Sequence, residues 1–306
     1  MEDFKMERAT IEITYDCTLK CKLCSNYSPY VPLDQRRYPL QVCTKVFDKF
    51  FQIITYVGIF TISGGEPLLH PNLFELLEHL QNYSLNIGEV QVVTNGTLVP
   101  SQKILESLKQ WGQKAFLIVD NYGAELSTKI KEIDMLLTNE NIRHTIRNYT
   151  INDPHCGGWV DFGSLTIQTQ RSLELAEKLF AKCSVAQNLH FCFPIMGSEM
   201  WPCAPARRRA QLGFEADSSE YIDLFDDSLT IEEQREKIRA IYGKKSLSAC
   251  AYCTGLCEDS VRVVPGEQLS SEEMKYVRAG AACYADVLQM MQTTRNGGSK
   301  IEFEEG

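Results

Sequence analysis

Three cysteines lie close together near the start of the sequence, at a spacing that could support chemistry. Cys17, Cys21 and Cys24 belong to "CTLKCKLC", where three residues separate the first pair and two separate the second. Three thiolates fall one short of the four that a structural zinc site uses. They suit a cubane [4Fe–4S] cluster, in which each cysteine binds one iron and the fourth iron keeps an open site for another ligand.

The other cysteines are distributed unevenly along the chain. Twelve are present in total, and Cys43, inside an amphipathic segment, is expected to belong to the core. Where thiols stay reduced, so many cysteines indicate metal or redox chemistry rather than disulfides. The distribution predicts two metal centres in two regions. The second group comprises Cys183, Cys192, Cys203, Cys250, Cys253, Cys257 and Cys283.

Composition and charge exclude several classes of function. The chain has 306 residues, with 40 acidic against 31 basic side chains and a net charge of -9, so a surface for nucleic acid is not expected. No apolar run reaches the ~20 residues that a membrane helix needs, and the N-terminus lacks the pattern of a signal peptide. We therefore expect a cytoplasmic protein with neither a nucleic-acid nor a membrane partner.

The first half of the sequence predicts the elements that must position these cysteines. Strands alternate with helices, which is typical of an α/β protein with a parallel sheet, open or rolled into a barrel. In both forms, ligands gather at the carboxyl ends of the strands. The predicted strands cover residues 10–15, 57–63, 89–94, 114–120 and 142–151, and the predicted helices cover 40–54, 72–83, 101–111 and 125–140.

Polar and glycine-rich stretches follow these strands. In "SGGEP", Gly64 and Gly65 would let the backbone approach a ligand, Glu66 offers an acceptor, and Pro67 fixes the exit of the strand. "VVTNGT", "VDNYG" and "NDPHCGGW" follow later strands. The cysteine triplet precedes all of them, at the end of the first strand.

Taken together, the CX3CX2C triplet and the downstream GGEP stretch resemble the radical S-adenosylmethionine (radical SAM) family. The resemblance implies a partial (β/α)6 TIM-like barrel, in which the amino and carboxylate groups of SAM chelate the open iron. Glu66 would accept from the methionine ammonium, and Thr94 and Asn95 would contact the ribose. Asp120 is expected near SAM or substrate. Leu23 stands where the family commonly has an aromatic residue packed on the adenine.

The C-terminal cysteines resemble the twitch domain, a shortened form of the SPASM extension. There a hairpin pair and a CX2C pair hold one auxiliary [4Fe–4S] cluster, which implies Cys192, Cys203, Cys250 and Cys253 as ligands. Cys183 stays open as a replacement for Cys192, and a tetrathiolate zinc site would use the same ligands. The predicted domains are a barrel over 1–180, a twitch-type domain over 181–275, and a C-terminal helix with an acidic tail over 276–306.

The resemblance implies a radical oxidoreductase or epimerase. We predict hydrogen abstraction from a carbinol carbon of a small hydroxylated substrate, with flavodoxin or ferredoxin as reductant. Dehydrogenation would use the auxiliary cluster as electron acceptor, and epimerisation would need a thiol donor, Cys257 or Cys156. The alternative is modification of a ribosomally made peptide, which the absence of an ~80-residue module before the first strand disfavours. The arginine run 207–209 is expected to be solvated, with contact of one arginine to an anionic substrate or a nucleotide-linked phosphate as the alternative.

Overall fold

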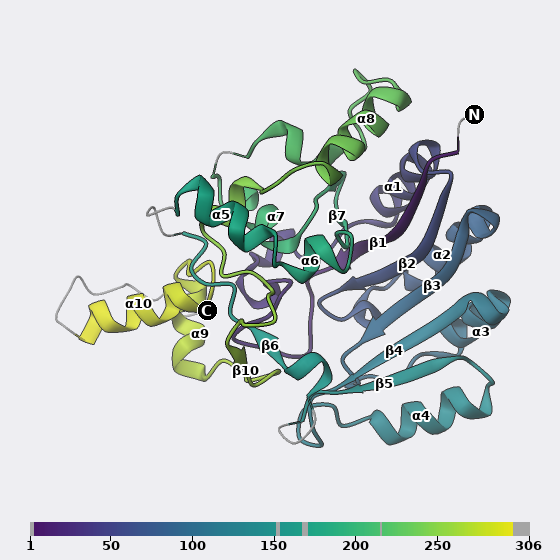
Figure 1. Cartoon of the computed structure of the whole chain (residues 1–306). Coiled ribbons are helices and arrows are strands. Elements are labelled where there is room, and N and C mark those ends of the chain that lie inside the picture. Colours follow the sequence, from purple (N-terminus) through teal and green to yellow (C-terminus); the bar gives the residue numbers. More distant parts are fainter. Residues whose placement is uncertain (1–2, 151–153, 167–170, 215, 296–306) are drawn as a thin grey trace.

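The computed structural model describes residues 3–150, 154–166, 171–214 and 216–295, and one eight-stranded sheet organises them (Figure 1). Five parallel strands lie in the order β5-β4-β3-β2-β1 and alternate with helices, so the predicted α/β fold with a parallel sheet is confirmed. The strands are β1 (Lys5–Thr14), β2 (Tyr56–Gly64), β3 (Ile87–Thr94), β4 (Ala115–Asn121) and β5 (His144–Asn148). The helices between them are α1 (Leu40–Ile53), α2 (Leu73–Leu80), α3 (Gln102–Gln110) and α4 (Ile130–Asn139).

The other edge of the sheet is built from the C-terminal half. Strand β7 (Pro194–Met196) pairs in parallel with β1, and the antiparallel strands β8 (Glu199–Met200) and β9 (Ile222–Asp223) follow. The sheet therefore continues across the predicted boundary at residues 180–181. The hairpin implied between Cys192 and Cys203 is the β7–β8 pair, which turns at Gly197.

Among the described residues, β5 is the edge strand of the sheet, and no further strand lies beside it. The next strand in sequence, β6 (Trp159–Val160), instead pairs antiparallel with β10 (Arg262–Val263) in a separate two-stranded sheet. Because β10 takes up its backbone hydrogen bonds, β6 does not extend the main sheet. Six parallel strands are nevertheless present in the main sheet, because β7 pairs in parallel with β1. Residue 151, the predicted end of the fifth strand, lies outside the described residues.

The remaining helices lie in the C-terminal half. Several begin at a polar cap, and the Ser270 hydroxyl accepts from the Glu273 backbone N–H at 3.2 Å. The α-helices there are α5 (Leu173–Phe180), α6 (Ser184–Gln187), α7 (Ala204–Gln211), α8 (Ile231–Tyr242), α9 (Ser271–Arg278) and α10 (Tyr284–Arg295). The 3-10 turns are Ser28–Tyr30, Leu33–Gln35, Pro67–Leu69, Gln81–Asn86, Gly112–Lys114, His155–Gly157, Ser218–Glu220 and Ser248–Ala251. No helix in the described part of the chain is long and apolar enough to cross a membrane.

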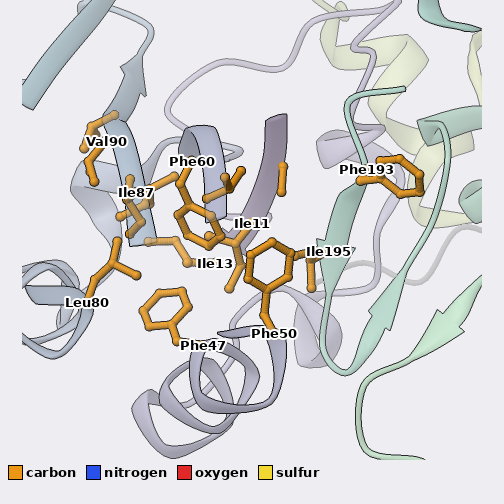
Figure 2. Packing of buried hydrophobic residues seen from close by; sticks show 14 of the residues in the cluster. Ile11, Ile13, Phe47, Phe50, Phe60, Leu80, Ile87, Val90, Phe193 and Ile195 are labelled. Atoms are coloured by element: carbon orange, nitrogen blue, oxygen red, sulfur yellow. The ribbon is translucent and has the colours of Figure 1, made fainter. Parts of the chain in front are cut away.

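The core lies between the sheet and its helices. In Figure 2, Phe47 and Phe50 of α1 point toward Phe60 of β2 and toward Ile11 and Ile13 of β1. The two α1 rings meet the Phe60 ring at centroid distances of 5.7 and 5.4 Å, both edge to face. Each buried side chain of this size contributes about 1.5–3 kcal/mol. Because strand residues alternate between faces, their neighbours in sequence face the other side of the sheet, where the site lies.

Candidate cofactor and substrate site

A cavity of about 450 Å³ adjoins the carboxyl ends of strands β1 to β5. It brings together most of the residues predicted from the N-terminal half, although these come from four separate segments of sequence. Its wall includes Cys17, Cys21, Cys24, Gly64, Gly65, Thr94, Asn95 and Asp120. The carboxyl ends of the parallel strands thus converge as the predicted sheet requires.

Each cysteine of the triplet receives hydrogen bonds at its sulfur. The Leu19 backbone N–H donates to Cys17 Sγ at 3.4 Å, and the Gln268 side-chain amide donates to Cys21 Sγ at 3.2 Å. Backbone N–H groups of the following turn donate to Cys24. Donors of this kind surround the sulfurs of iron–sulfur clusters, where they stabilise negative charge.

The chemistry of this triplet fits a metal cluster. Burial raises the pKa of Cys17 to about 11 and also raises the pKa values of Cys21 and Cys24. Thiolates at neutral pH therefore need the positive charge of a bound metal. Within residues 3–295, gaps excluded, no three His, Cys, Asp or Glu side chains converge on one metal ion. In a cubane each thiolate binds a different iron.

Gly64 and Gly65 are required by contacts within the protein. A Cβ on Gly64, whose φ is +142°, would lie 2.2 Å from the Thr14 carbonyl oxygen, and one on Gly65 would lie 2.4 Å from that of Asp16. The Gly65 N–H donates to Thr14 O at 2.7 Å. The glycines therefore dock the end of β2 against the segment that leads into the cysteine loop.

Glu66 lies elsewhere than predicted. Its side chain is fully buried, and its two carboxylate oxygens accept from the backbone N–H groups of Leu68 at 3.1 Å and Asn95 at 2.8 Å. It does not line the cavity. Burial raises the pKa of Glu66 to about 7, against the lowering effect of these bonds. The carboxylate joins the end of β2 to the end of β3, and Pro67, also buried, begins the turn that follows.

We expect Glu66→Gln to lower both the thermal stability and the affinity for SAM. The amide would turn an N–H group toward one of the two backbone donors, and a hydrogen bond to a charged group is worth about 1.5–3 kcal/mol. SAM affinity should fall by roughly ten- to a hundredfold through misplaced Asn95. Calorimetry with SAM and thermal unfolding measure the two effects, with exposed Glu78→Gln as control. Lower SAM affinity at unchanged thermal stability would instead show that Glu66 contacts the methionine ammonium directly.

Asn95 and Asp120 line the cavity, but protein groups hold their side chains. The Asn95 amide donates to Thr18 Oγ1 at 3.0 Å and to Cys17 Sγ at 3.5 Å. The Asp120 carboxylate accepts from Arg147 Nε at 2.6 Å and from Arg147 Nη2 at 2.9 Å. These contacts make both residues rigid parts of the wall.

Leu23 is placed apart from this cavity. It lines a separate cavity of about 20 Å³ together with Tyr27 and Tyr30. The predicted packing of Leu23 on an adenine therefore finds no counterpart in the geometry, because Leu23 does not line the larger cavity.

A second cavity, of about 40 Å³, lies among the C-terminal cysteines. Cys183, Cys203, Cys250 and Cys253 line it with apolar side chains, whereas Cys192 lines the larger cavity. The Ser184 N–H, next to Cys183, donates to Leu256 O at 2.7 Å and so ties this segment to the CX2C loop. The structure thus groups Cys183, the alternative left open above, with the other three, and not Cys192.

These thiols also receive backbone donors. The Leu247 N–H donates to Cys250 Sγ at 3.4 Å, and the Gly255 N–H donates to Cys253 Sγ at 3.3 Å. Burial raises the pKa of Cys250 to about 11 and that of Cys253 to about 12. Four thiols around an apolar pocket, two of them with N–H donors, fit a metal centre that carries its own positive charge.

The two cavities share a wall. Cys203, Val185 and Leu256 line both of them, as do Phe162 and Pro205. Whatever occupies the larger cavity therefore lies directly beside the group of four cysteines. The two regions for which metal centres were predicted are therefore adjacent in the structure.

The two predicted donor thiols lie outside both cavities. Cys257 is 2% exposed, and its S–H points to Leu179 O at 3.9 Å. Cys156 is exposed to solvent in a 3-10 turn. Neither thiol lines the space where a substrate would bind, so both assignments are corrected. Cys257 is close to the CX2C pair in sequence, but packing buries its side chain.

Polar residues on the inner face of the sheet were missed from the sequence. Arg8, Thr10 and Glu12 of β1 line the larger cavity, as do Thr61 of β2 and Gln91 of β3. The signal was present, because the β1 residues alternate with the buried Ala9, Ile11 and Ile13.

The arginine run is buried rather than solvated. Arg207 is 1% exposed, Arg208 4% and Arg209 9%. Arg207 Nη1 lies 2.6 Å from Glu12 Oε2, so a buried ion pair stands behind the cavity wall. The expectation of solvated arginines is wrong because α7 packs against β1 and the cysteine loop.

Comparison with known proteins gives a family match over the N-terminal part. The profile of the radical SAM superfamily matches residues 11–123. The antilisterial bacteriocin subtilosin biosynthesis protein AlbA of Bacillus subtilis (strain 168) is 35% identical over 122 residues, 39% of this chain and 25% of AlbA. PqqA peptide cyclase of Gluconobacter oxydans (strain 621H) is 31% identical over 120 residues, 37% of this chain and 31% of that protein. The chain spans about a quarter to a third of the length of these relatives.

Solved structures resemble a larger share of the chain. BtrN in complex with AdoMet and 2-DOIA matches with a TM-score of 0.53 at 15% identity, over 88% of this chain and 98% of BtrN. Native anSMEcpe with bound AdoMet and the Kp18Cys peptide matches with a TM-score of 0.50 at 13% identity, over 96% of this chain and all (100%) of that chain. At such identities the likeness is one of fold.

Proposed function

We propose that this protein abstracts hydrogen from a carbinol carbon of a small hydroxylated substrate. The proposal starts from the match of residues 11–123 to the radical SAM superfamily, whose cofactors are SAM and a [4Fe–4S] cluster. Cys17, Cys21 and Cys24 would hold the cluster, and SAM would chelate the open iron. Reduction of the cluster, by flavodoxin or ferredoxin, supplies the chemistry by cleaving SAM to methionine and a 5′-deoxyadenosyl radical. The substrate would be a sugar, sugar nucleotide or aminocyclitol.

The polar residues that line the larger cavity are the observation that supports a small hydroxylated substrate. Arg8, Thr10 and Glu12 offer a cation, a hydroxyl and a carboxylate, and Thr61 and Gln91 add further hydrogen-bonding groups. Such a wall matches a molecule with several hydroxyl groups, because each buried hydroxyl needs a partner. A volume of about 450 Å³ suits a small molecule lying beside SAM.

The neighbouring cysteines support dehydrogenation as the reaction. We assign Cys183, Cys203, Cys250 and Cys253 to an auxiliary [4Fe–4S] cluster behind the shared wall. Hydrogen abstraction leaves a carbon radical next to the hydroxyl group. The cluster held by these four cysteines would accept one electron, and loss of the hydroxyl proton would then leave a carbonyl, so the substrate would lose two hydrogens in total.

Two further readings have observations of their own. Cys192 lines the larger cavity and is placed to return hydrogen to a substrate radical, as an epimerase requires. Modification of a peptide is favoured by the relatives, since AlbA acts in subtilosin biosynthesis and the second relative is a PqqA peptide cyclase. Both proteins extend well beyond the matched region, so we place this reading behind the small substrate.

Isotope transfer tests the proposal. Reconstituted protein, SAM and dithionite are incubated with sugars, sugar nucleotides and aminocyclitols deuterated at their carbinol carbons. We expect deuterium in 5′-deoxyadenosine together with a carbonyl product. Solvent deuterium at the product carbon, lost in Cys192→Ala, would establish epimerisation in place of oxidation. Label transferred from a deuterated peptide, and from none of the small molecules, would overturn the substrate class.

A further inference from the structure

Residues 262–269, here named the C-terminal strap, run from the two-stranded β6–β10 sheet to the cysteine loop. At one end β10 pairs with β6. At the other end the Leu269 N–H donates to Lys20 O at 2.8 Å, and the Lys22 N–H donates to Glu267 O at 2.8 Å. The strap therefore forms backbone hydrogen bonds directly with the loop that carries the cysteine triplet.

Charged groups reinforce this contact. Lys22 Nζ lies 2.7 Å from Glu267 Oε1 and 3.1 Å from Glu273 Oε1, on helix α9. The Tyr284 hydroxyl donates to the same Glu273 oxygen at 2.7 Å. The side chains of Lys22 and Glu273 are only 15% and 9% exposed, so this second pair is shielded from water and holds α9, which follows the strap, against the cysteine loop.

Gln268, at the centre of the strap, points its amide into the loop in a defined orientation. Its Oε1 accepts from the Lys20 backbone N–H at 2.6 Å, which only the oxygen end can do. Its Nε2 must then face the other way, where it donates to Cys21 Sγ at 3.2 Å and to Gly266 O at 2.6 Å. Protein contacts on both ends therefore hold an N–H group against the sulfur.

This donor differs from those of the other two cysteines in its origin. Cys17 and Cys24 are served by backbone groups of their own loop, and Cys17 also by Asn95 of the matched domain. Cys21 receives its side-chain donor from Gln268, far beyond the region 11–123 that the family profile covers. The C-terminal segment thus completes the surroundings of a centre that belongs to the N-terminal domain.

We propose that Gln268 tunes the SAM-binding cluster, raising its reduction potential through the hydrogen bond to Cys21. The inference rests on the proposed assignment of the cysteine triplet to that cluster. Reduction adds negative charge to the cluster and its sulfurs, and an N–H donor stabilises the reduced form more than the oxidised form. Gln268 would act through its hydrogen bond to Cys21, without contacting the substrate.

Potentiometric titration followed by electron paramagnetic resonance tests this on the reconstituted full chain. In Gln268→Leu we expect the reduction equilibrium of the SAM-binding cluster to shift about tenfold toward the oxidised form, which is about 59 mV for a one-electron couple. The auxiliary cluster serves as internal reference and should stay unchanged. Gln289→Ala, at an exposed position of α10, is the matched control.

A second variant guards against loss of the cluster. Gln268→Glu keeps the acceptor for Lys20 but sets an anionic oxygen against the sulfur, so its potential should fall at least as far as that of the leucine variant. An unchanged potential in either iron-replete variant, or an equal shift of both clusters, would overturn the role of Gln268. The SAM-dependent change in the wild-type spectrum tests the proposed function separately.

Discussion

Replacing Cys17, Cys21 and Cys24 together by alanine should remove about four of roughly eight irons from anaerobically reconstituted protein, one cubane of two. It should also abolish reductive cleavage of SAM, because no open iron is left to chelate its amino and carboxylate groups. The four auxiliary cysteines line the smaller cavity and should keep their share of the iron. Iron analysis and chromatography of 5′-deoxyadenosine measure both effects.

Cys43→Ala is the matched control for this variant. Cys43 is 2% exposed in helix α1 and lines neither cavity, so its loss should leave iron content and SAM cleavage unchanged. Formation of 5′-deoxyadenosine by the triple variant would show that the cysteine triplet does not hold the SAM-binding cluster.

Cys183→Ala should reduce the iron content to about four per chain, while Cys192→Ala should leave it near eight. Cys183 lines the small cavity with the other three thiols, and Cys192 lines the larger one near Arg8. SAM cleavage should survive in both variants, whereas product formation should stop in Cys183→Ala if the auxiliary cluster accepts the substrate electron. The two variants thus test whether the auxiliary cluster uses Cys183, which lines the small cavity with the other three thiols, or Cys192, which was predicted from its position on the hairpin.

The reverse pattern, with iron lost from Cys192→Ala and retained in Cys183→Ala, would return Cys192 to the ligand set. A zinc centre would show itself differently, as one zinc and about four irons in the wild-type protein. Metal analysis of the two variants beside the wild type therefore separates both alternatives from the proposed cluster.

The sheet could be predicted because its determinants are local. Alternating apolar residues, helical periodicity and turn residues marked all five strands β1 to β5 and the helices between them. Pairing between distant segments could not be predicted in the same way. Strand β7 joins β1 and strand β6 leaves the sheet for β10, and these choices depend on which backbone edges meet in the folded chain.

The same distinction between local patterns and contacts of distant segments applies to the residues of the site. Cys17, Cys21 and Cys24 were predictable because short spacing forces them together. Cys183 and Cys192 are nearly equivalent in sequence, and only packing of α6 on the CX2C loop separates them. The partners of Glu66 could not be predicted either, since a buried carboxylate binds whichever N–H groups the fold presents. Gln268 carries no local pattern, because its role depends on a contact across most of the chain.

Electron paramagnetic resonance of the reduced wild-type protein, recorded before and after addition of SAM, tests the central claim most directly. Two [4Fe–4S] clusters predict two overlapping signals. SAM should change the one whose open iron it chelates and leave the fully cysteine-ligated one as it was. A spectrum that SAM does not alter, or a protein that holds a single cluster, would contradict an enzyme with one SAM-binding centre and one auxiliary centre.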